Sequence, residues 1–239
     1  MKNILIITII LFIFSLVFYF YDKLKKIYRK KVLNLSFWRD RNENHHNELL
    51  QFINEIIPYL EKWKVRYWAH AGTLLGCVRH GGFIPWDDDI DFGYIDDGNI
   101  EDLKNDLINN DYKIGYGKLN IFYKCGFKIE SNYNKNLWID MFTFTKENDM
   151  LKQTKAAELI WPKENYYYDE VFPLKNGKFN DINIPIPNDP DKFCSRAFGN
   201  NYISTFYINL PHLFNNIIEV IIITSISKEK FYMKDLIDE

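Results

Sequence analysis

The chain has 239 residues, of which 47% are hydrophobic and 17% aromatic, so it holds enough apolar material for one sizeable core. Its net charge of -2 gives no sign of a nucleic-acid-binding surface. The three cysteines, Cys77, Cys125 and Cys194, are widely spaced and form no C-x-x-C or Cys/His group, which argues against a zinc site.

The N-terminal segment is the most apolar part of the chain. Residues 4–21 form an almost unbroken apolar run of about the length that crosses a bilayer. No small-x-small cleavage site follows, and aromatic residues close the run. We therefore expect an uncleaved transmembrane signal anchor over residues 1–22, followed by a basic stem over residues 23–41.

Two signals disagree about the orientation of this anchor. Six lysine or arginine residues lie within residues 23–31, and the positive-inside rule would keep the rest of the chain on the cytoplasmic side. The glycosylation sequon Asn34-Leu35-Ser36 favours the lumenal side instead. The expected location is an ER/Golgi-type or equivalent membrane, with the side left open.

Hydrophobic periodicity and turn residues predict the elements that follow the stem. Apolar residues at helical spacing predict a helix over residues 42–64, which Pro58 should kink or divide. A strand over residues 66–71 precedes a helix that Gly72 opens and that ends at the glycines after His80. Further strands are expected at residues 90–94, 112–116, 120–123, 127–130, 137–144 and 182–187, and helices at residues 100–109 and 189–198. Residues 217–226 are apolar but too short and interrupted to predict a second membrane span.

The most informative motif joins a small-residue turn to a cluster of carboxylates. Residues 72–76 read GTLLG, and residues 85–91 read PWDDDID. Alternate side chains of an extended strand share one face, so Asp87, Asp89 and Asp91 would point the same way. Clustered carboxylate oxygens suit Mg²⁺ or Mn²⁺. The pattern predicts a half-buried strand that presents metal ligands at a cleft.

Simpler interpretations of these residues remain open. A lone acidic cluster is usually a solvated turn, although the preceding glycine-rich helix argues against that here. An EF-hand loop starting at Asp87 is excluded, because its sixth and twelfth positions are Phe92 and Gly98 instead of glycine and glutamate. Structural alternatives exist for Thr73 as a helix cap, Arg79 as the partner of an acid and Asp88 as a residue facing away from the site. For Lys128, a position on a strand near the site allows a phosphate contact, but a solvated strand lysine is favoured.

The run over residues 72–91, GTLLGCVRHGGFIPWDDDID, resembles the signature of the LicD family. That family includes bacterial phosphocholine transferases and the animal fukutin and fukutin-related proteins. Later stretches also resemble the family pattern, so the resemblance covers about residues 67–202; they are WIDMF at 138–142, VFPL at 171–174, IPIP at 184–187 and FGNNY at 198–202. Phe198 departs from the pattern, which usually has tyrosine before the glycine.

The resemblance implies a fold and an activity. It implies an α/β (α+β) domain over residues 42–239 with the DNA polymerase beta-like nucleotidyltransferase fold, in which helices flank a mixed, curved sheet of about four or five strands. It implies transfer of a phosphoalcohol, such as phosphocholine or ribitol phosphate, from a CDP-linked donor to a hydroxyl of a glycan or glycoprotein, with release of CMP. A non-catalytic glycan-binding or scaffolding protein on the same fold is the alternative.

The resemblance also assigns roles to residues. Asp89 and Asp91 match the two metal-binding acids of the superfamily, and Asp140 matches the third, which ligates Mg²⁺ or Mn²⁺ or accepts the proton of the acceptor hydroxyl. Asp87 would add to the catalytic group. Substrate-binding roles fall to three residues of the helix that Gly72 opens: Gly72 for close approach to a phosphate, Thr73 as a hydrogen-bond donor at the helix N-terminus, and Arg79, about two turns later, as a phosphate contact.

Overall fold

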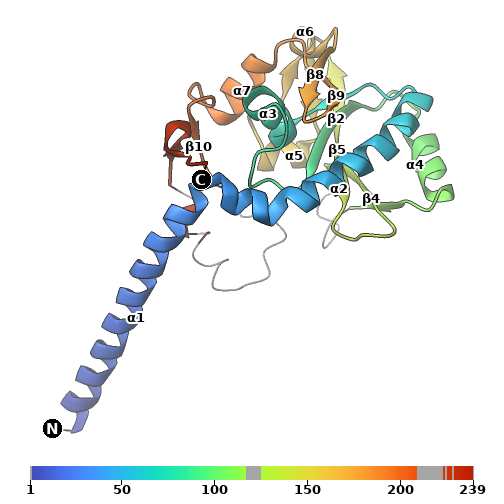
Figure 1. Cartoon of the computed structure of the whole chain (residues 1–239). Helices are drawn as coiled ribbons and strands as arrows, with labels where there is room; N and C mark the ends of the chain where they lie inside the picture. Colours follow the sequence, from blue (N-terminus) through green and yellow to red (C-terminus); the bar gives the residue numbers. More distant parts are fainter. Residues whose placement is uncertain (1, 117–124, 209–222, 224, 228, 239) are drawn as a thin grey trace. The chain divides into compact units, whose positions relative to one another are not determined.

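The computed structural model describes residues 2–116, 125–208, 223, 225–227 and 229–238 (Figure 1). Internal contacts divide the chain into two compact units, which are described separately below. One unit contains Met1–Arg41 together with Ser204–Glu239, and the other contains Asn42–Ile203. The strand expected at residues 120–123 and most of the apolar stretch at residues 217–226 lie outside the described residues.

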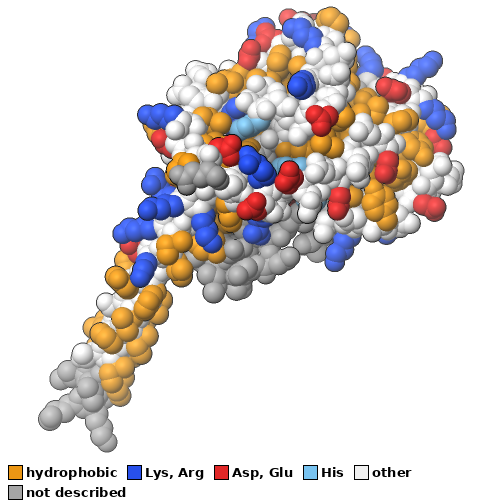
Figure 2. Space-filling model, in the orientation of Figure 1, with side chains coloured by type: hydrophobic (Ala, Val, Ile, Leu, Met, Phe, Trp, Pro, Cys, Tyr) orange, Lys and Arg blue, Asp and Glu red, His pale blue; other side chains and the backbone are white. Residues whose placement is uncertain are grey.

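The first unit is built on helix α1 (Lys2–Val32) and on the start of helix α2 (Leu35–Lys62). Large apolar side chains from Ile6 to Phe20 are exposed, as the orange side chains around α1 show in Figure 2. Within the described residues, Ile6–Val32 is the one stretch long and apolar enough to cross a membrane by length and composition. An exposed helix that is apolar all round matches the expectation of a membrane anchor.

The C-terminal segment of this unit packs against the residues that follow α1. Strand β10 (Thr205–Phe206) pairs with β11 (Phe231–Tyr232), and a 3₁₀ turn, η2, covers Met233–Asp235. The Ile237 carbonyl accepts a hydrogen bond from the Leu35 amide at 2.7 Å, and Glu229 forms ion pairs with Lys25 and Arg29. The tail therefore closes back on the basic stem.

The second unit is organised around a mixed sheet that has seven strands within the described residues. Its main path runs β1-β2-β5-β4-β3, and β6 and β7 extend it from β5. The strands are β1 (Tyr67–Ala69), β2 (Ile90–Ile95), β3 (Lys113–Gly115), β4 (Gly126–Glu130), β5 (Trp138–Glu147), β6 (Met150–Gln153) and β7 (Tyr166–Tyr167). The β2–β5 pair is parallel and the other pairs are antiparallel. The mixed sheet confirms the expected fold class, but it has more strands than the four or five expected.

Pro58 was expected to kink or divide helix α2; the helix continues through it, so division is excluded. Proline removes one backbone donor, and the carbonyl that would have accepted it belongs to Asn54. Pro58 and Asn54 are both exposed, so water can satisfy the freed carbonyl. The opposite face of the helix is fully buried and carries Leu49, Phe52, Ile53, Ile56 and Leu60. Burial of that apolar face holds the helix together across the proline.

Two helices connect the first strands. Helix α3 (Ala71–His80) lies between β1 and β2 and ends at Gly81, whose φ of 67° is in the left-handed region that favours glycine. Helix α4 (Ile100–Asn109) follows β2 with the bounds expected from the sequence. Both helices bury an apolar side, which for α4 consists of Ile100, Leu103 and Leu107.

The chain beyond β5 contains elements for which the sequence carried weak signals. Helices α5 (Lys155–Ile160) and α6 (Tyr168–Val171) flank β7, and β8 (Lys175–Phe179) forms a hairpin with β9 (Ile182–Ile186). Helix α7 (Pro190–Phe198) starts with Asp189 as its N-cap and buries Phe193 and Cys194. The strand expected at residues 182–187 and the helix expected at residues 189–198 are both present.

Candidate active site

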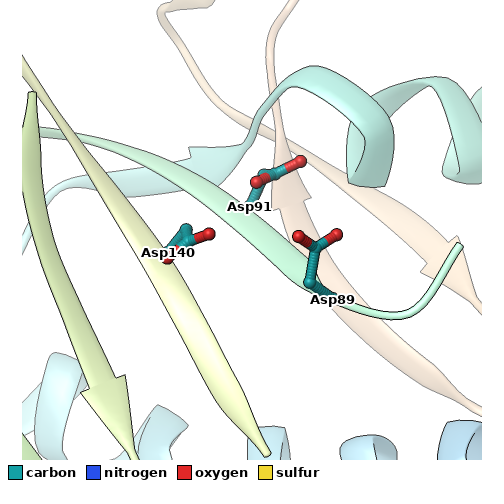
Figure 3. Close-up of side chains that lie close together, drawn as sticks. All are labelled: Asp89, Asp91 and Asp140. Carbon is teal, nitrogen blue, oxygen red and sulfur yellow. The ribbon is translucent and has the colours of Figure 1, made fainter. Parts of the chain in front are cut away.

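Three carboxylates converge above the centre of the sheet. Asp91 of β2 and Asp140 of β5 are register partners on neighbouring parallel strands, so their side chains stand next to each other on one face. Asp89 lies one residue before β2. One oxygen from each of the three lies within 4.8 Å of the others, and Figure 3 shows the carboxylates gathered around a common space.

The three carboxylates are shielded from water to different degrees: Asp140 is buried, and Asp89 and Asp91 are half-buried. Asp140 is only 6% exposed. Burial raises the pKa of Asp91 well above its usual range, and the charges of Asp89, Asp140 and Asp87 act in the same direction. Like charges held together away from water are costly unless a cation lies between them.

The donor set fits a divalent cation with a preference for oxygen ligands. Oxygens that share one Mg²⁺ ligand sphere lie about 3 to 4 Å apart, given ligand distances of about 2.1 Å. The observed spread of 4.8 Å is close to that range, and small side-chain rotations would close the difference. Asp89, Asp91 and Asp140 are therefore the residues that could hold a metal ion.

The β1–α3 connection positions Asp91 through three hydrogen bonds. The backbone amide of His70 donates to the Asp91 carbonyl at 3.0 Å, and the Gly72 amide donates to Asp91 Oδ2 at 3.2 Å. The Asp91 amide donates to Thr73 Oγ1 at 2.8 Å. Thr73 is 2% exposed, so its hydroxyl is part of the buried framework that fixes β2. Its neighbour in the structure is therefore the acidic strand, whereas the sequence suggested a phosphate or a helix cap.

Gly72 lies where a side chain would collide with the acids. A Cβ at this position would lie 2.8 Å from Asp87 Oδ2 and 3.4 Å from Asp91 Oδ2. Gly72 was expected from the sequence to allow close approach of a phosphate to the backbone. In the structure, the close approach of two carboxylates is what a side chain here would disturb, and Asp87 would have to move to make room for it.

Asp87 lies beside the group of three and is not part of it. The expected strand with alternating acids begins only at Ile90, because residues 87–89 have no regular structure. The prediction that Asp87, Asp89 and Asp91 share a face of one strand was therefore wrong in its local geometry. The Asp87 carboxylate still lies close enough to Gly72 and Asp91 to raise the Asp91 pKa. Asp88, expected to face away, is 2% exposed and buried.

Helix α2 holds the loop that carries these acids. Asn42 Nδ2 donates to the Pro85 carbonyl at 2.9 Å. Nε2 of His45 and of His46 lie 2.8 and 2.7 Å from the carbonyls of Asp88 and Asp87, respectively. The His46 ring also stacks on Phe83, with centroids 4.2 Å apart and planes 5° apart. Carbonyl groups only accept, so both histidines donate to the loop.

Arg79 has partners within the protein. Its Nη1 donates to the Tyr202 carbonyl at 3.1 Å, and its Nε donates to His80 Nε2 at 3.0 Å. Burial lowers its pKa to about 10, while the charge of Asp87 acts in the opposite direction. The guanidinium thus links α3 to the chain after α7. Its expected contact with a donor phosphate stays a prediction.

Two further charged residues lie near the triad, and only Lys128 of these was considered from the sequence. Lys128, for which a solvated position was favoured, contacts the Asp140 carboxylate, and its side chain is only 17% exposed. Glu164 lies near enough to raise the Asp91 pKa, and its carboxylate is 3.3 Å from Nε2 of the buried His70. For Lys128, the alternation of residues along β4 was a signal that could have placed it on the face of the acids. No sequence motif marks Glu164.

The fold and the acids define a class of protein: a mixed-sheet α/β domain with a three-carboxylate centre. Residues 64–189, more than half of the chain, match the family model described as LicD/FKTN/FKRP, nucleotidyltransferase domain. The chain belongs to this family. The matched residues contain all three converging acids, the glycine-rich start of α3 and the loop that α2 holds.

Curated proteins with similar sequences carry transferase names or no functional name. The chain is 32% identical over 152 residues to "Uncharacterized protein RT0683" of Rickettsia typhi, which covers 63% of this chain and 45% of that protein. It is 31% identical over 149 residues to "Ribitol 5-phosphate transferase FKRP" of Mus musculus, covering 60% of this chain and 30% of the mouse protein. A shorter match, 61% over 31 residues, covers 13% of this chain and 12% of "Lipopolysaccharide cholinephosphotransferase LicD" of Haemophilus influenzae. This chain therefore aligns with less than half of each of these three relatives.

Proposed function

We propose that this protein transfers a phosphoalcohol, such as phosphocholine or ribitol phosphate, from a CDP-linked donor to a hydroxyl of a glycan or glycoprotein, with release of CMP. The family membership supports a transferase, since its named relatives include a ribitol 5-phosphate transferase and a cholinephosphotransferase. The convergence of Asp89, Asp91 and Asp140 is the observation that carries the proposal.

The three acids would hold Mg²⁺ or Mn²⁺. A divalent cation bound there would neutralise charge on the phosphate oxygens of the donor and lower the pKa of the attacking hydroxyl. Asp140, on the strand next to that of Asp91, would ligate the metal or accept the proton of the acceptor hydroxyl. Asp87 would contribute negative charge at the edge of this group.

The substrate-binding roles proposed for the start of α3 follow from its position beside the acids. The amide of Gly72 and the hydroxyl of Thr73 hold Asp91, so they would act on the substrate through the acid that they orient. The charge of Asp87 acts on the Arg79 guanidinium, so this side chain lies near the acids. Arg79 would contact a phosphate of the donor from that position.

Product analysis tests this function. Full-length protein in detergent is incubated with a panel of CDP-alcohols, an acceptor glycan and Mg²⁺ or Mn²⁺, and CMP is measured. We expect metal-dependent CMP release that falls at least about 1,000-fold in Asp89→Asn and Asp91→Asn, in line with removal of a transition-state charge stabiliser. Asp102→Asn, at an exposed position of α4, is the matched control and should retain activity. Unchanged CMP release in both site variants would refute the proposal, and release of pyrophosphate would assign nucleotidyl transfer instead.

We also propose that α1 anchors the protein in an ER/Golgi-type or equivalent membrane. The supporting observation is its exposed apolar surface, followed by basic residues in its last turn. This division keeps residues 1–22 as the anchor, 23–41 as the stem and 42–239 as the catalytic part. The full-length protein should resist alkaline carbonate extraction from membranes, whereas a chain lacking residues 1–22 should be released. Release of both forms would contradict the anchor.

A further inference from the structure

Lys128 extends the row of charges across the sheet. Asp91 of β2 is the register partner of Asp140 of β5, and Asp140 is the register partner of Lys128 of β4. Side chains of directly paired residues stand on the same face of a sheet. The site thus contains an Asp–Asp–Lys row on three adjacent strands, with the lysine on the side of Asp140 away from Asp91.

The ammonium group of Lys128 is held at this place and is shielded from water. Its Nζ contacts Asp140 Oδ1, and the two side chains are 17% and 8% exposed. Nζ also lies 5.0 Å from the centroid of the Trp138 ring, at a distance suited to a cation–π contact. Burying a lysine and a carboxylate together costs desolvation of both, so the pair contributes little to stability on its own.

The charge of this lysine is small compared with the negative charge beside it. Asp89, Asp91 and Asp140 bring three carboxylates within 4.8 Å of one another, and the one ammonium of Lys128 contacts that of Asp140. A divalent cation shared by the three acids would reduce the charge on Asp140 and weaken its hold on Lys128. A lysine has a flexible four-carbon stem and three donors, so its ammonium could then move to another anion without a change of backbone.

We propose that Lys128 is a phosphate-binding residue of the donor site, and that it exchanges Asp140 for a phosphate oxygen when metal and nucleotide are both bound. The inference rests on the proposed function, because it requires a diphosphate donor above the three acids. In the absence of ligands the lysine balances part of the charge on Asp140 and keeps the acids together. With ligands bound it neutralises phosphate charge on the β4 side of the site.

Two titrations of the full-length protein in detergent test the inference without relying on turnover. The first measures Mn²⁺ affinity by calorimetry, and the second measures CDP affinity at saturating Mn²⁺. The variants are Lys128→Met, Lys128→Arg and the control Lys104→Met. Lys104 is a good match, because its side chain is 16% exposed, pairs with Glu101 and lies over the Phe127 ring, but belongs to α4.

The two titrations should change in opposite directions for Lys128→Met. Without a competing ammonium at Asp140, Mn²⁺ should bind about threefold to tenfold more tightly. CDP should bind about tenfold or more weakly, because a charge-assisted contact to phosphate is lost. Lys128→Arg should keep most of the CDP affinity, and Lys104→Met should match the wild type in both titrations.

The possible failures are distinguishable. Tighter Mn²⁺ binding with unchanged CDP affinity in Lys128→Met would overturn the phosphate contact and leave the proposed metal site standing. Unchanged Mn²⁺ affinity in Lys128→Met, with an intact thermal transition, would also overturn the inference. It would show that Lys128 and the metal do not compete for Asp140. Absence of Mn²⁺ binding by the wild-type protein would overturn both the inference and the metal-dependent function on which it rests.

Discussion

Asp91 and Asp140 stand side by side on parallel strands β2 and β5, although they are far apart in the chain. Two charges of the same sign that face each other on neighbouring strands destabilise a sheet, and burial of this pair increases the effect. Such a pair therefore has a stability cost, which Lys128 offsets in part and a bound cation would offset further. Sites that bind or react commonly combine a local stability cost with a functional gain.

Replacing Asp91 by asparagine should make the metal-free protein more stable. Asparagine keeps an oxygen that can accept from the Gly72 amide but removes one buried charge. With a chelator present, the free energy of unfolding should rise by about 1 to 2 kcal/mol. Urea titrations of wild type and variant at pH 7.5 measure the difference. Adding Mn²⁺ should stabilise the wild type and leave Asp91→Asn unchanged. A variant less stable than the wild type under chelation would contradict the repulsion argument.

Replacing two glycines of α3 by alanine should have different effects, on activity for Gly72 and on stability for Gly76. In Gly72→Ala the new Cβ meets Asp87 Oδ2 at 2.8 Å, and a flexible carboxylate can move away. This variant should fold with a loss below about 1 kcal/mol but release CMP at least about tenfold more slowly. In Gly76→Ala the Cβ would lie 2.4 Å from the Gly82 carbonyl, where backbone must shift. That variant should lose about 2 kcal/mol or more of stability.

Thermal melts and CMP release on the two variants check this contrast. The prediction fails if Gly72→Ala melts well below Gly76→Ala, or if Gly72→Ala releases CMP at the wild-type rate. Because both glycines lie in the same helix, the gain in helix propensity from glycine to alanine affects both variants alike.

The local elements around the acids could be predicted because their signals are short-range. Periodicity and capping residues marked α3 and α4, and the glycines after His80 marked the end of α3. The position of Asp140 beside Asp91 has no local signal, since it depends on which strands pair and in which register. The family resemblance supplied that relationship. Lys128 shows this limit. The alternation of β4 indicates which residues share a face with Lys128, but only the register between β4 and β5 shows that Asp140 lies beside it.

Longer-range packing explains the remaining differences. Helix α2 tolerates Pro58 because burial of its opposite face outweighs the lost hydrogen bond, and a propensity rule cannot weigh that burial. Asp87 lies before the start of β2 instead of on a strand with Asp89 and Asp91. Its carbonyl and that of Asp88 accept hydrogen bonds from histidines of α2, which hold this segment as a loop. Strands β6 and β7 join the sheet only through β5, so their short sequences carry little evidence of their own.

The hydroxyl of Thr73 should matter more for the fold than its methyl group does. Thr73→Val keeps the shape but leaves the Asp91 amide without its acceptor at 2.8 Å. A buried donor without a partner costs about 1 to 3 kcal/mol, so the variant should melt several degrees lower. Thr73→Ser keeps the oxygen and is the matched control, with an expected loss below about 1 kcal/mol. Equal melting temperatures for the two variants would show that this hydrogen bond does not hold β2.

His46 should make the acid-bearing loop sensitive to low pH. Burial lowers the pKa of His46 to about 4 from a usual value of 6.5, although its hydrogen bond to the Asp87 carbonyl acts in the opposite direction. The unfolded chain therefore binds more protons than the folded one between these values, and stability falls as the pH drops below about 6.5. At pH 5 this one group should cost about 2 kcal/mol relative to pH 7. His46→Gln keeps a donor for the carbonyl and cannot titrate, so it should lose less stability between pH 7 and pH 5 by that amount. Urea midpoints of both proteins at the two pH values provide the measurement. Parallel losses in wild type and variant would mean that folding does not lower the pKa of His46, and that its stacking on Phe83 does not require the neutral ring.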